Sequence, residues 1–212
     1  MSDVVIIDYG MGNLKSIQRG LEKVDANVTL STDSEVIATA DRLVLPGVGA
    51  FESGMLGLKD REITDAIYAF VKTGNPLLGI CLGMQMFLDK SEEHGNHQGL
   101  GLIPGIVKKI PESDQGKFQR KVPHIGWTNL HAPVNGKWKN SCLEEIEQGE
   151  YFYFVHSYMA VPEKKEHTLA ECKDEGLTLT AAVKKDNIIG LQFHPEKSGE
   201  VGLKILKTFV NN

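Results

Sequence analysis

The segment PLLGICLGMQMFLD, residues 76–89, decides the fold of this chain. Its apolar residues 77–80 have the length and composition of a buried β-strand, and residues 82–89 follow with a helical pattern. Cys81 stands between them, and a glycine two residues away on each side lets the chain turn sharply. The segment therefore predicts a strand, a tight turn with a cysteine at its tip, and a helix.

The rest of the first half continues this alternation of strand and helix. Apolar runs predict strands at residues 4–7, 27–30 and 42–45, and helical spacing predicts helices at about 13–24 and 63–71. Glycines at positions 54 and 57 interrupt the helix expected over residues 52–60. Alternation of this kind predicts an α/β fold with a mostly parallel open sheet flanked by helices.

The second half is dominated by patterns typical of strands. We expect strands at residues 122–130, 151–155, 168–172, 179–183 and 188–193, and a final helix at about 200–210. Asp186-Asn187 suits a tight hairpin turn between the last two strands, Asn135-Gly136 predicts another turn, and residues 115–121 predict a flexible loop. These strands predict antiparallel additions to one domain that spans residues 1–212.

Composition narrows the class of protein. Hydrophobic residues make up 41% of the 212 positions and charged residues 24%, as in ordinary globular proteins. The net charge of −5 gives no electrostatic footprint for nucleic acid, and no apolar run approaches the roughly 20 residues that cross a membrane. Three cysteines without a CxxC pair indicate neither a disulfide framework nor a zinc site. We therefore expect a cytoplasmic protein without a structural metal.

Cys81 lies in the pattern Gly79-Ile80-Cys81-Leu82-Gly83, which has the form of a nucleophile elbow. The turn would expose the sulfur near a helix N-terminus, where the helix dipole and free N–H groups favour the thiolate. The backbone N–H of Leu82 would then be one donor to an oxyanion. The alternative is a buried structural cysteine, which is a common fate of this residue type.

A base and an orienting carboxylate follow the last predicted strand, in Phe193-His194-Pro195-Glu196. A cysteine nucleophile needs a base that also protonates the leaving group, and a histidine serves both steps. A carboxylate two residues further on can orient the imidazole. Read alone, the segment could be a loop with a solvated carboxylate. Together with the elbow it predicts Cys81, His194 and Glu196 as nucleophile, base and orienter.

A glycine-rich loop follows the predicted strand at 42–45. Gly47 and Gly49 flank Val48, so the backbone can adopt unusual angles and approach a substrate closely. In an open α/β sheet this loop would lie beside Cys81, across the carboxyl ends of neighbouring strands. We expect the backbone N–H of Val48 to be the second oxyanion donor.

Five segments carry a resemblance to a known family. They are DYGMGN at residues 8–13, PGVG at 46–49, GICLGMQ at 79–85, PHIGW at 123–127 and FHPEKS at 193–198. Together they resemble the glutaminase subunits of imidazole glycerol phosphate synthase, within the class I (triad) glutamine amidotransferase family, over essentially the whole chain. The resemblance implies a flavodoxin-like fold, a Cys81–His194–Glu196 triad and no cofactor.

The resemblance also assigns glutamine binding to Gln85, Glu93, His156, Ser157 and Tyr158. Glu93 would supply the charge for the substrate ammonium, and the segment at 157–158 would offer backbone and hydroxyl groups to the carboxylate. Glu93 could instead be a solvated helix end. His156 could equally be a core residue.

His124 and Trp127 lie in an apolar predicted strand, and we expect them to be structural rather than catalytic. Cys142 and Cys172 have no elbow and no nearby histidine partner in sequence, so we expect both thiols to be inert.

The resemblance implies a heterodimer with a (β/α)₈-barrel cyclase subunit. That partner would use the ammonia to make imidazole glycerol phosphate and AICAR in histidine biosynthesis, and Asn13, Tyr153 and Lys197 would face it. One alternative is a paralogous glutaminase that supplies a sugar amidotransferase in surface-polysaccharide synthesis. Others are a cysteine peptidase or a noncatalytic homologue on the same fold. Glu93 and the segment at 157–158 favour recognition of a free amino acid over a peptide.

Overall fold

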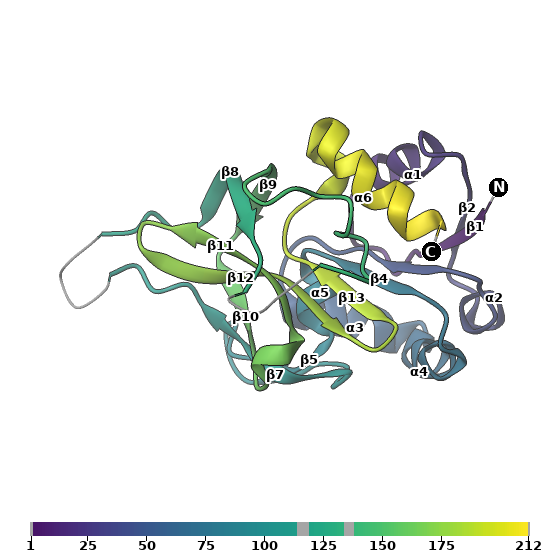
Figure 1. Ribbon diagram of the computed structural model, residues 1–212. Helices are drawn as coiled ribbons and strands as arrows, with labels where there is room; N and C mark the ends of the chain where they lie inside the picture. Colours follow the sequence, from purple (N-terminus) through teal and green to yellow (C-terminus); the bar gives the residue numbers. More distant parts are fainter. Residues whose placement is uncertain (1, 114–118, 134–137, 212) are drawn as a thin grey trace.

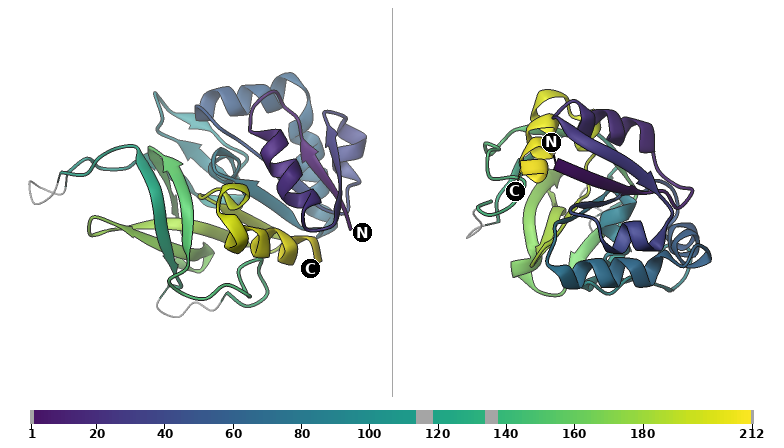
Figure 2. Two further views of the ribbon diagram at one scale, coloured as in Figure 1. Left: turned by 90° about the horizontal axis from the view of Figure 1, so that it is seen from above. Right: turned by 90° about the vertical axis from the view of Figure 1, so that its right-hand side faces the viewer.

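The fold is built on a nine-stranded sheet. A computed structural model describes residues 2–113, 119–133 and 138–211. The strand order is β2-β1-β3-β4-β13-β12-β11-β8-β9. Helices cover the half of the sheet that carries both termini. The other half extends away from these helices and consists of strands and loops (Figure 1, Figure 2).

The helix-covered half is parallel, as predicted. Its strands are β1 (Ser2–Ile7), β2 (Ala26–Ser31), β3 (Leu43–Leu45), β4 (Leu77–Ile80) and β13 (Ile188–Leu191). Every pairing between neighbours in this set is parallel. The strand at 188–193 was expected among the antiparallel additions, but β13 pairs in parallel with β4. The carboxyl ends of β3, β4 and β13 therefore meet at one edge of the sheet, where ligand sites form in open α/β sheets.

Two apolar layers hold helices against the two faces of this sheet. The helices are α1 (Leu14–Glu22), α2 (Ser34–Ala38), α3 (Phe51–Asp60), α4 (Ile63–Thr73), α5 (Leu82–Met86) and α6 (Gly199–Asn211). Val4 and Ile6 of β1 join the cluster formed with α1 and α6. Val5 and Ile7 join the cluster formed with α3 and α4. This alternation is the period of two that a strand buried on both faces requires.

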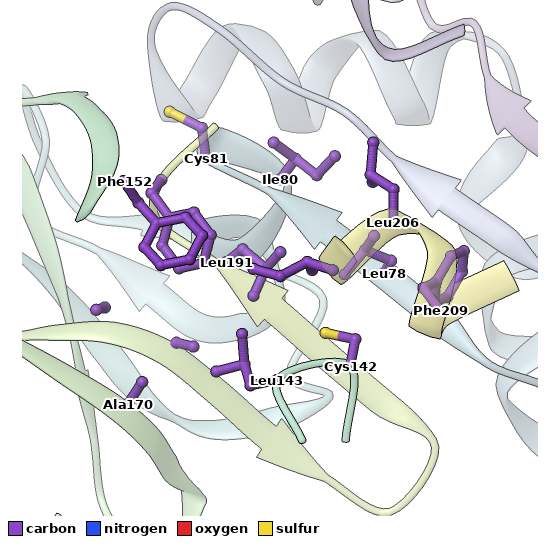
Figure 3. Close-up of a cluster of buried hydrophobic side chains, with 14 of the residues drawn as sticks. Leu78, Ile80, Cys81, Cys142, Leu143, Phe152, Ala170, Leu191, Leu206 and Phe209 are labelled. Carbon is purple, nitrogen blue, oxygen red and sulfur yellow. The ribbon is translucent and has the colours of Figure 1, made fainter. Parts of the chain in front are cut away.

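The apolar cluster beneath α6 extends as far as Cys81, the residue at the tip of the elbow. Leu78 and Ile80 of β4 lie in it with Leu206 and Phe209 of α6, and Cys81 stands at its border (Figure 3). All four apolar side chains are at most 3% exposed. Burying each one stabilises the fold by about 1.5–3 kcal/mol, so β4 is held firmly up to the residue before the cysteine.

The other half of the sheet is antiparallel, as predicted. Its strands are β8 (His124–His131), β9 (Tyr151–His156), β11 (Thr168–Asp174) and β12 (Leu177–Lys185), which pairs with β13. The hairpin between β12 and β13 turns at Asp186, whose φ is +52°. The predicted turn at Asn135-Gly136 and residues 115–118 of the predicted loop lie outside the described residues.

The structure contains a second, four-stranded sheet that the sequence did not predict. Its order is β10-β7-β5-β6, formed by β10 (Tyr158–Pro162), β7 (Ile103–Lys109), β5 (Leu88–Ser91) and β6 (His97–Gln98). The helix predicted over residues 82–89 is therefore wrong at its end, since α5 stops at Met86. The carbonyl of Phe87 accepts hydrogen bonds from Leu102 and Ile103, which draws the chain into a strand.

The short helix α2 was not predicted, and the other predicted elements differ only at their ends. The strand predicted over 188–193 stops at Leu191, and β8 starts at His124 rather than at residue 122. The glycines at 54 and 57 do not break α3: a Cβ at Gly57 would lie 3.0 Å from Tyr9, and one at Gly54 would lie 2.7 Å from the sulfur of Met86. These glycines let α3 approach its neighbours closely. No helix in the described part of the chain is long and apolar enough to cross a membrane.

The two remaining elements are the short 3₁₀ helices η1 (Lys165–His167) and η2 (Pro195–Lys197). α6 begins directly against η2, and Gly202 makes this contact possible. A Cβ at Gly202 would lie 1.9 Å from the carbonyl oxygen of Pro195. The backbone cannot accommodate this atom without moving η2.

We expect Gly202→Ala to lower the free energy of unfolding by about 1–3 kcal/mol, because overpacking outweighs the gain in helix propensity. Urea denaturation followed by circular dichroism measures this change. Gly20→Ala on α1 is the control, since the nearest atom to its added Cβ is the flexible tip of Leu206. Equal stability of the Gly202→Ala variant and the wild type would contradict the packing described here.

Candidate active site

Cys81 occupies a strained turn between β4 and α5. Its φ is +55° and its ψ is −110°, a conformation that residues other than glycine rarely adopt. The backbone N–H of Cys81 donates to the carbonyl of Leu191 over 2.7 Å, so the turn is anchored to β13. A strained residue held by its surroundings is typical of a functional site.

The two glycines of the elbow are required by packing. A Cβ at Gly79 would lie 2.4 Å from the ring of Phe87, and one at Gly83 would lie 1.9 Å from the carbonyl oxygen of Leu45. Neither glycine has a positive φ. Their role is therefore to let α5 lie directly against β3 and β4, which leaves the positive φ to Cys81 itself.

His194 and Glu196 form a buried pair. Nδ1 of His194 lies 2.8 Å from Oε1 of Glu196, and the two side chains are 3% and 0% exposed. The backbone N–H of His194 donates to the carbonyl of Tyr153, and Oγ of Ser198 donates to the carbonyl of His194. These bonds hold the segment in place. The carboxylate on Nδ1 leaves Nε2, which has no hydrogen-bond partner among the described residues, as the reactive nitrogen.

The charges around His194 favour its protonated form. Burial alone would lower the pKa of the imidazole, but the Cys81 sulfur and the Glu196 carboxylate outweigh it and raise the pKa to about 9. An imidazolium beside a sulfur favours the thiolate. Burial raises the pKa of both Cys142 and Cys172 to about 12, so these two thiols stay protonated at neutral pH.

A pocket of about 310 Å³ opens over Cys81. It is lined by Val48, Gly49, Cys81, Leu82, Gln85, Glu93, Pro123, Val155, His156, Ser157, Tyr158 and His194. Most of the residues expected from the sequence therefore meet in one place. Pro123 and Val155 were not expected, because neither carries a polar side chain that would mark a binding site.

The loop at residues 46–49 lies against the elbow. A Cβ at Gly47 would lie 2.7 Å from Leu82 Cβ, so Gly47 stands behind the pocket wall rather than in it. Gly49 has a φ of +96°, which explains the need for glycine there. The hydroxyl of Tyr9, a buried residue that the sequence did not single out, donates to the carbonyl of Pro46 over 2.7 Å. This bond fixes the start of the loop beside Cys81.

Glu93 is neither a solvated helix end nor a free carboxylate. Its Oε2 accepts a hydrogen bond from the backbone N–H of Phe51 over 2.7 Å, at the first residue of α3. Ala50, the residue before the helix, provides no side-chain cap. Glu93 thus caps α3 from a distance while it lines the pocket, and the helix holds the carboxylate in position.

Gln85 and His156 are largely buried and line the inner part of the pocket. Nε2 of Gln85 donates to the carbonyl of Tyr158 and to Oε1 of Gln192, each over 3.0 Å. Nδ1 of His156 lies 2.8 Å from the same carbonyl of Tyr158. Burial lowers the pKa of His156 to about 4, so this imidazole is neutral and donates from Nδ1. The sequence did not point to Gln192 as a site residue. A single polar residue at the end of an apolar strand could have drawn attention to it.

His124 is buried, as its place in an apolar strand predicts, but Trp127 in the same strand is not a core residue. His124 is buried, and its Nδ1 lies 3.3 Å from Asp174. Trp127 is 54% exposed. Its ring meets that of Tyr153 edge-on at 6.1 Å, and Nζ of Lys197 lies 5.9 Å from the Tyr153 centroid. Of the three residues expected to face the partner, Tyr153 and Lys197 are therefore neighbours. The third, Asn13, is exposed at the N-terminus of α1.

Comparison with known proteins gives one consistent family. The family model "Glutamine amidotransferase class-I" matches residues 5–212. An "Imidazole glycerol phosphate synthase subunit HisH 1" of Legionella pneumophila (strain Lens) is 48% identical, with 99% of each chain covered. A subunit HisH of Geobacter sulfurreducens is 45% identical, with 99% of this chain and 98% of the relative covered. A subunit HisH of Aquifex aeolicus is 43% identical, with 97% and 94% covered.

Solved structures share the fold at lower identity. A structure described as a glutamine amidotransferase superposes with a TM-score of 0.71 at 17% identity, covering 97% of this chain and 98% of that one. A chain of PurLQS from Thermotoga maritima superposes with a TM-score of 0.69 at 21% identity, covering 100% and 99%.

We expect Glu196→Gln to lower the pKa of His194 from about 9 by one to two units toward its ordinary value, because the variant removes the carboxylate charge. In the wild type the imidazolium should persist until the pH rises through about 9; in the variant it should be lost at lower pH. NMR titration of histidine-labelled protein measures both. His156, which is neutral at pH 7, provides the internal control. An unchanged His194 titration would show that Glu196 does not govern its charge.

Proposed function

This chain belongs to the class-I glutamine amidotransferase family, and on that premise we propose that it hydrolyses glutamine to glutamate and ammonia with Cys81 as nucleophile. The observation that carries the proposal is the pocket in which Cys81, at a positive φ, meets an imidazole bound to a buried carboxylate. In this proposal the whole chain, residues 1–212, acts as one amidotransferase domain.

The first half-reaction forms a thioester. The Cys81 thiolate attacks the side-chain amide carbon of glutamine, a C–S bond forms, and the carbonyl electron pair moves onto oxygen. Backbone N–H groups of Leu82 and Val48 stabilise this oxyanion. The C–N bond then breaks as the His194 imidazolium gives its proton to the departing nitrogen, which leaves as ammonia.

The second half-reaction regenerates the enzyme. Neutral His194 takes a proton from water, and the resulting hydroxide attacks the thioester carbon through a second oxyanion. The C–S bond breaks, glutamate leaves, and the thiolate again faces an imidazolium. Glu196 keeps the imidazole in one tautomer and orientation through both steps.

The pocket suits a free amino acid. Its volume of about 310 Å³ lies at the lower end of small-molecule sites. Glu93, held by the N-terminus of α3, pairs with the substrate ammonium, and the segment at Ser157 and Tyr158 binds the carboxylate. Gln85 and His156 support this segment from behind through the carbonyl of Tyr158. Recognition of both charged ends argues against a peptidase, since a peptide offers neither next to the scissile bond.

The ammonia serves histidine biosynthesis. Relatives that share 43–48% identity over nearly their whole length are named as HisH subunits of imidazole glycerol phosphate synthase. The same role follows for this chain, and the sugar amidotransferase alternative is not favoured. The acceptor is a (β/α)₈-barrel cyclase subunit that forms a heterodimer with this chain and makes imidazole glycerol phosphate and AICAR. In this proposal the complex works in the cytoplasm.

An exposed apolar face beside the triad supports such a partner. Ile125, Trp127 and Tyr151 are each more than half exposed, and with Tyr153 they share one face of the β8–β9 pair. We call these four residues the interface patch. The opposite face of the pair is buried against Phe193, next to His194. A partner bound to the interface patch, Lys197 and Asn13 would thus lie close to the site where ammonia is released.

We expect Cys81→Ala to lower the rate of glutamate release from glutamine by at least about 10⁴-fold, because no other group can form the thioester. Unfolding temperature and glutamine affinity should stay near wild type. A coupled glutamate dehydrogenase assay measures the rate, in the presence of the cyclase subunit. Cys142→Ala, which removes a buried thiol outside the pocket, should retain activity. Substantial glutamate release by the Cys81→Ala variant would contradict the proposal.

We expect Trp127→Ala to weaken binding of the cyclase subunit by about 30-fold, since a half-exposed tryptophan in an apolar patch is a typical hot spot. Isothermal titration calorimetry measures the affinity. Leu56→Ala on α3 is the control, because Leu56 is similarly exposed but lies outside the interface patch. If the two variants bound the partner equally tightly, the interface would have to lie elsewhere.

A further inference from the structure

Gln192 stands between the nucleophile and the floor of the pocket. It follows the last residue of β13, and its side chain is completely buried. Its Nε2 lies 3.8 Å from the Cys81 sulfur, and its Oε1 lies 3.0 Å from Nε2 of Gln85. The amide thus bridges Cys81 and Gln85, and none of the steps described above uses it.

One backbone carbonyl sets the direction of this chain of hydrogen bonds. The carbonyl of Tyr158 can only accept, so Gln85 must turn its NH₂ group toward it. The second N–H of that group then points at Gln192, which must present its oxygen. The NH₂ group of Gln192 is therefore left to face the sulfur. No other orientation of the two amides satisfies all three contacts.

We propose that Gln192 is a positioning residue that holds the Cys81 sulfur in the pocket and donates a hydrogen bond to its thiolate. The proposal rests on the proposed role of Cys81 as nucleophile. A donor to the charged form of a group favours that form. A hydrogen bond to sulfur at this distance is weak, but its donor is completely buried, and a low-dielectric surrounding strengthens it.

Gln192 differs from His194 in that its charge does not change during the cycle. The His194 imidazolium gives its proton to the leaving ammonia and regains one only when water is activated, so its charge beside the sulfur comes and goes. The amide of Gln192 does not titrate and keeps its N–H throughout. It therefore stabilises the sulfur as leaving group in the second half-reaction as well as the thiolate in the first.

Alkylation by iodoacetamide tests this proposal without using glutamine. The rate reports the thiolate of Cys81, since Cys142 and Cys172 are buried thiols whose pKa is raised to about 12. Gln192→Met removes the donor at similar volume, and Gln192→Glu replaces it with an acceptor. Gln85→Glu keeps Gln192 but turns its amide, so that its oxygen faces the sulfur. Gln98→Glu, at an exposed position on β6, is the matched control.

We expect the midpoint of the pH–alkylation profile to rise by about one pH unit in Gln192→Met and by more in the two Glu variants. The kcat for glutamine should fall about tenfold in Gln192→Met with KM nearly unchanged, since Gln192 does not line the pocket. Gln98→Glu should match wild type in both measurements.

The proposal would be overturned if any folded variant of Gln192 or Gln85 had the same midpoint of the pH–alkylation profile as the wild type. If substitution at one of these positions prevents folding, the variant at the other position still provides the test. Failure of the proposed function looks different. In that case the wild-type protein itself would release no glutamate, whatever its alkylation profile.

Discussion

The structure depends on one strained residue, because every part of the site is placed relative to Cys81 at a φ of +55°. Such a conformation costs on the order of 1–3 kcal/mol and persists only where the surroundings enforce it. The enforcing contacts are the bond from its N–H to Leu191 and the absence of side chains at Gly79 and Gly83. The buried parallel strands beneath, β4 and β13, supply the stability that offsets this strain.

A second constraint is electrostatic. A buried carboxylate and imidazole are costly unless each has a partner, and Glu196 and His194 pair with one another through Oε1 and Nδ1 at 2.8 Å. The segment that carries them is fixed by Ser198, which links it to β9, and by α6, which packs against η2 at Gly202. The raised pKa of His194 therefore follows from the placement of a loop by a helix and a strand.

Much of this arrangement could be predicted from sequence, because local patterns encode it. The elbow glycines, the apolar runs and His-Pro-Glu are contiguous, and the parallel sheet follows from alternation. The second sheet could not be predicted, since β5 forms through its pairing with β6 and β7, and Phe87 and Leu88 fit a helix equally well in isolation. The exposure of Trp127 and the bridging amide of Gln192 also depend on distant segments, so neither has a signature within its own strand.

The covalent intermediate offers the most direct test of the central claim that Cys81 is the nucleophile. Protein incubated with glutamine and the cyclase subunit is quenched in acid during turnover, and intact-mass and peptide mass spectrometry follow. The account predicts a labile γ-glutamyl adduct on the peptide that carries Cys81, which is absent from the Cys81→Ala protein and disappears on treatment with hydroxylamine. Sustained glutamate release with no adduct under any quench, or an adduct on another residue, would contradict it.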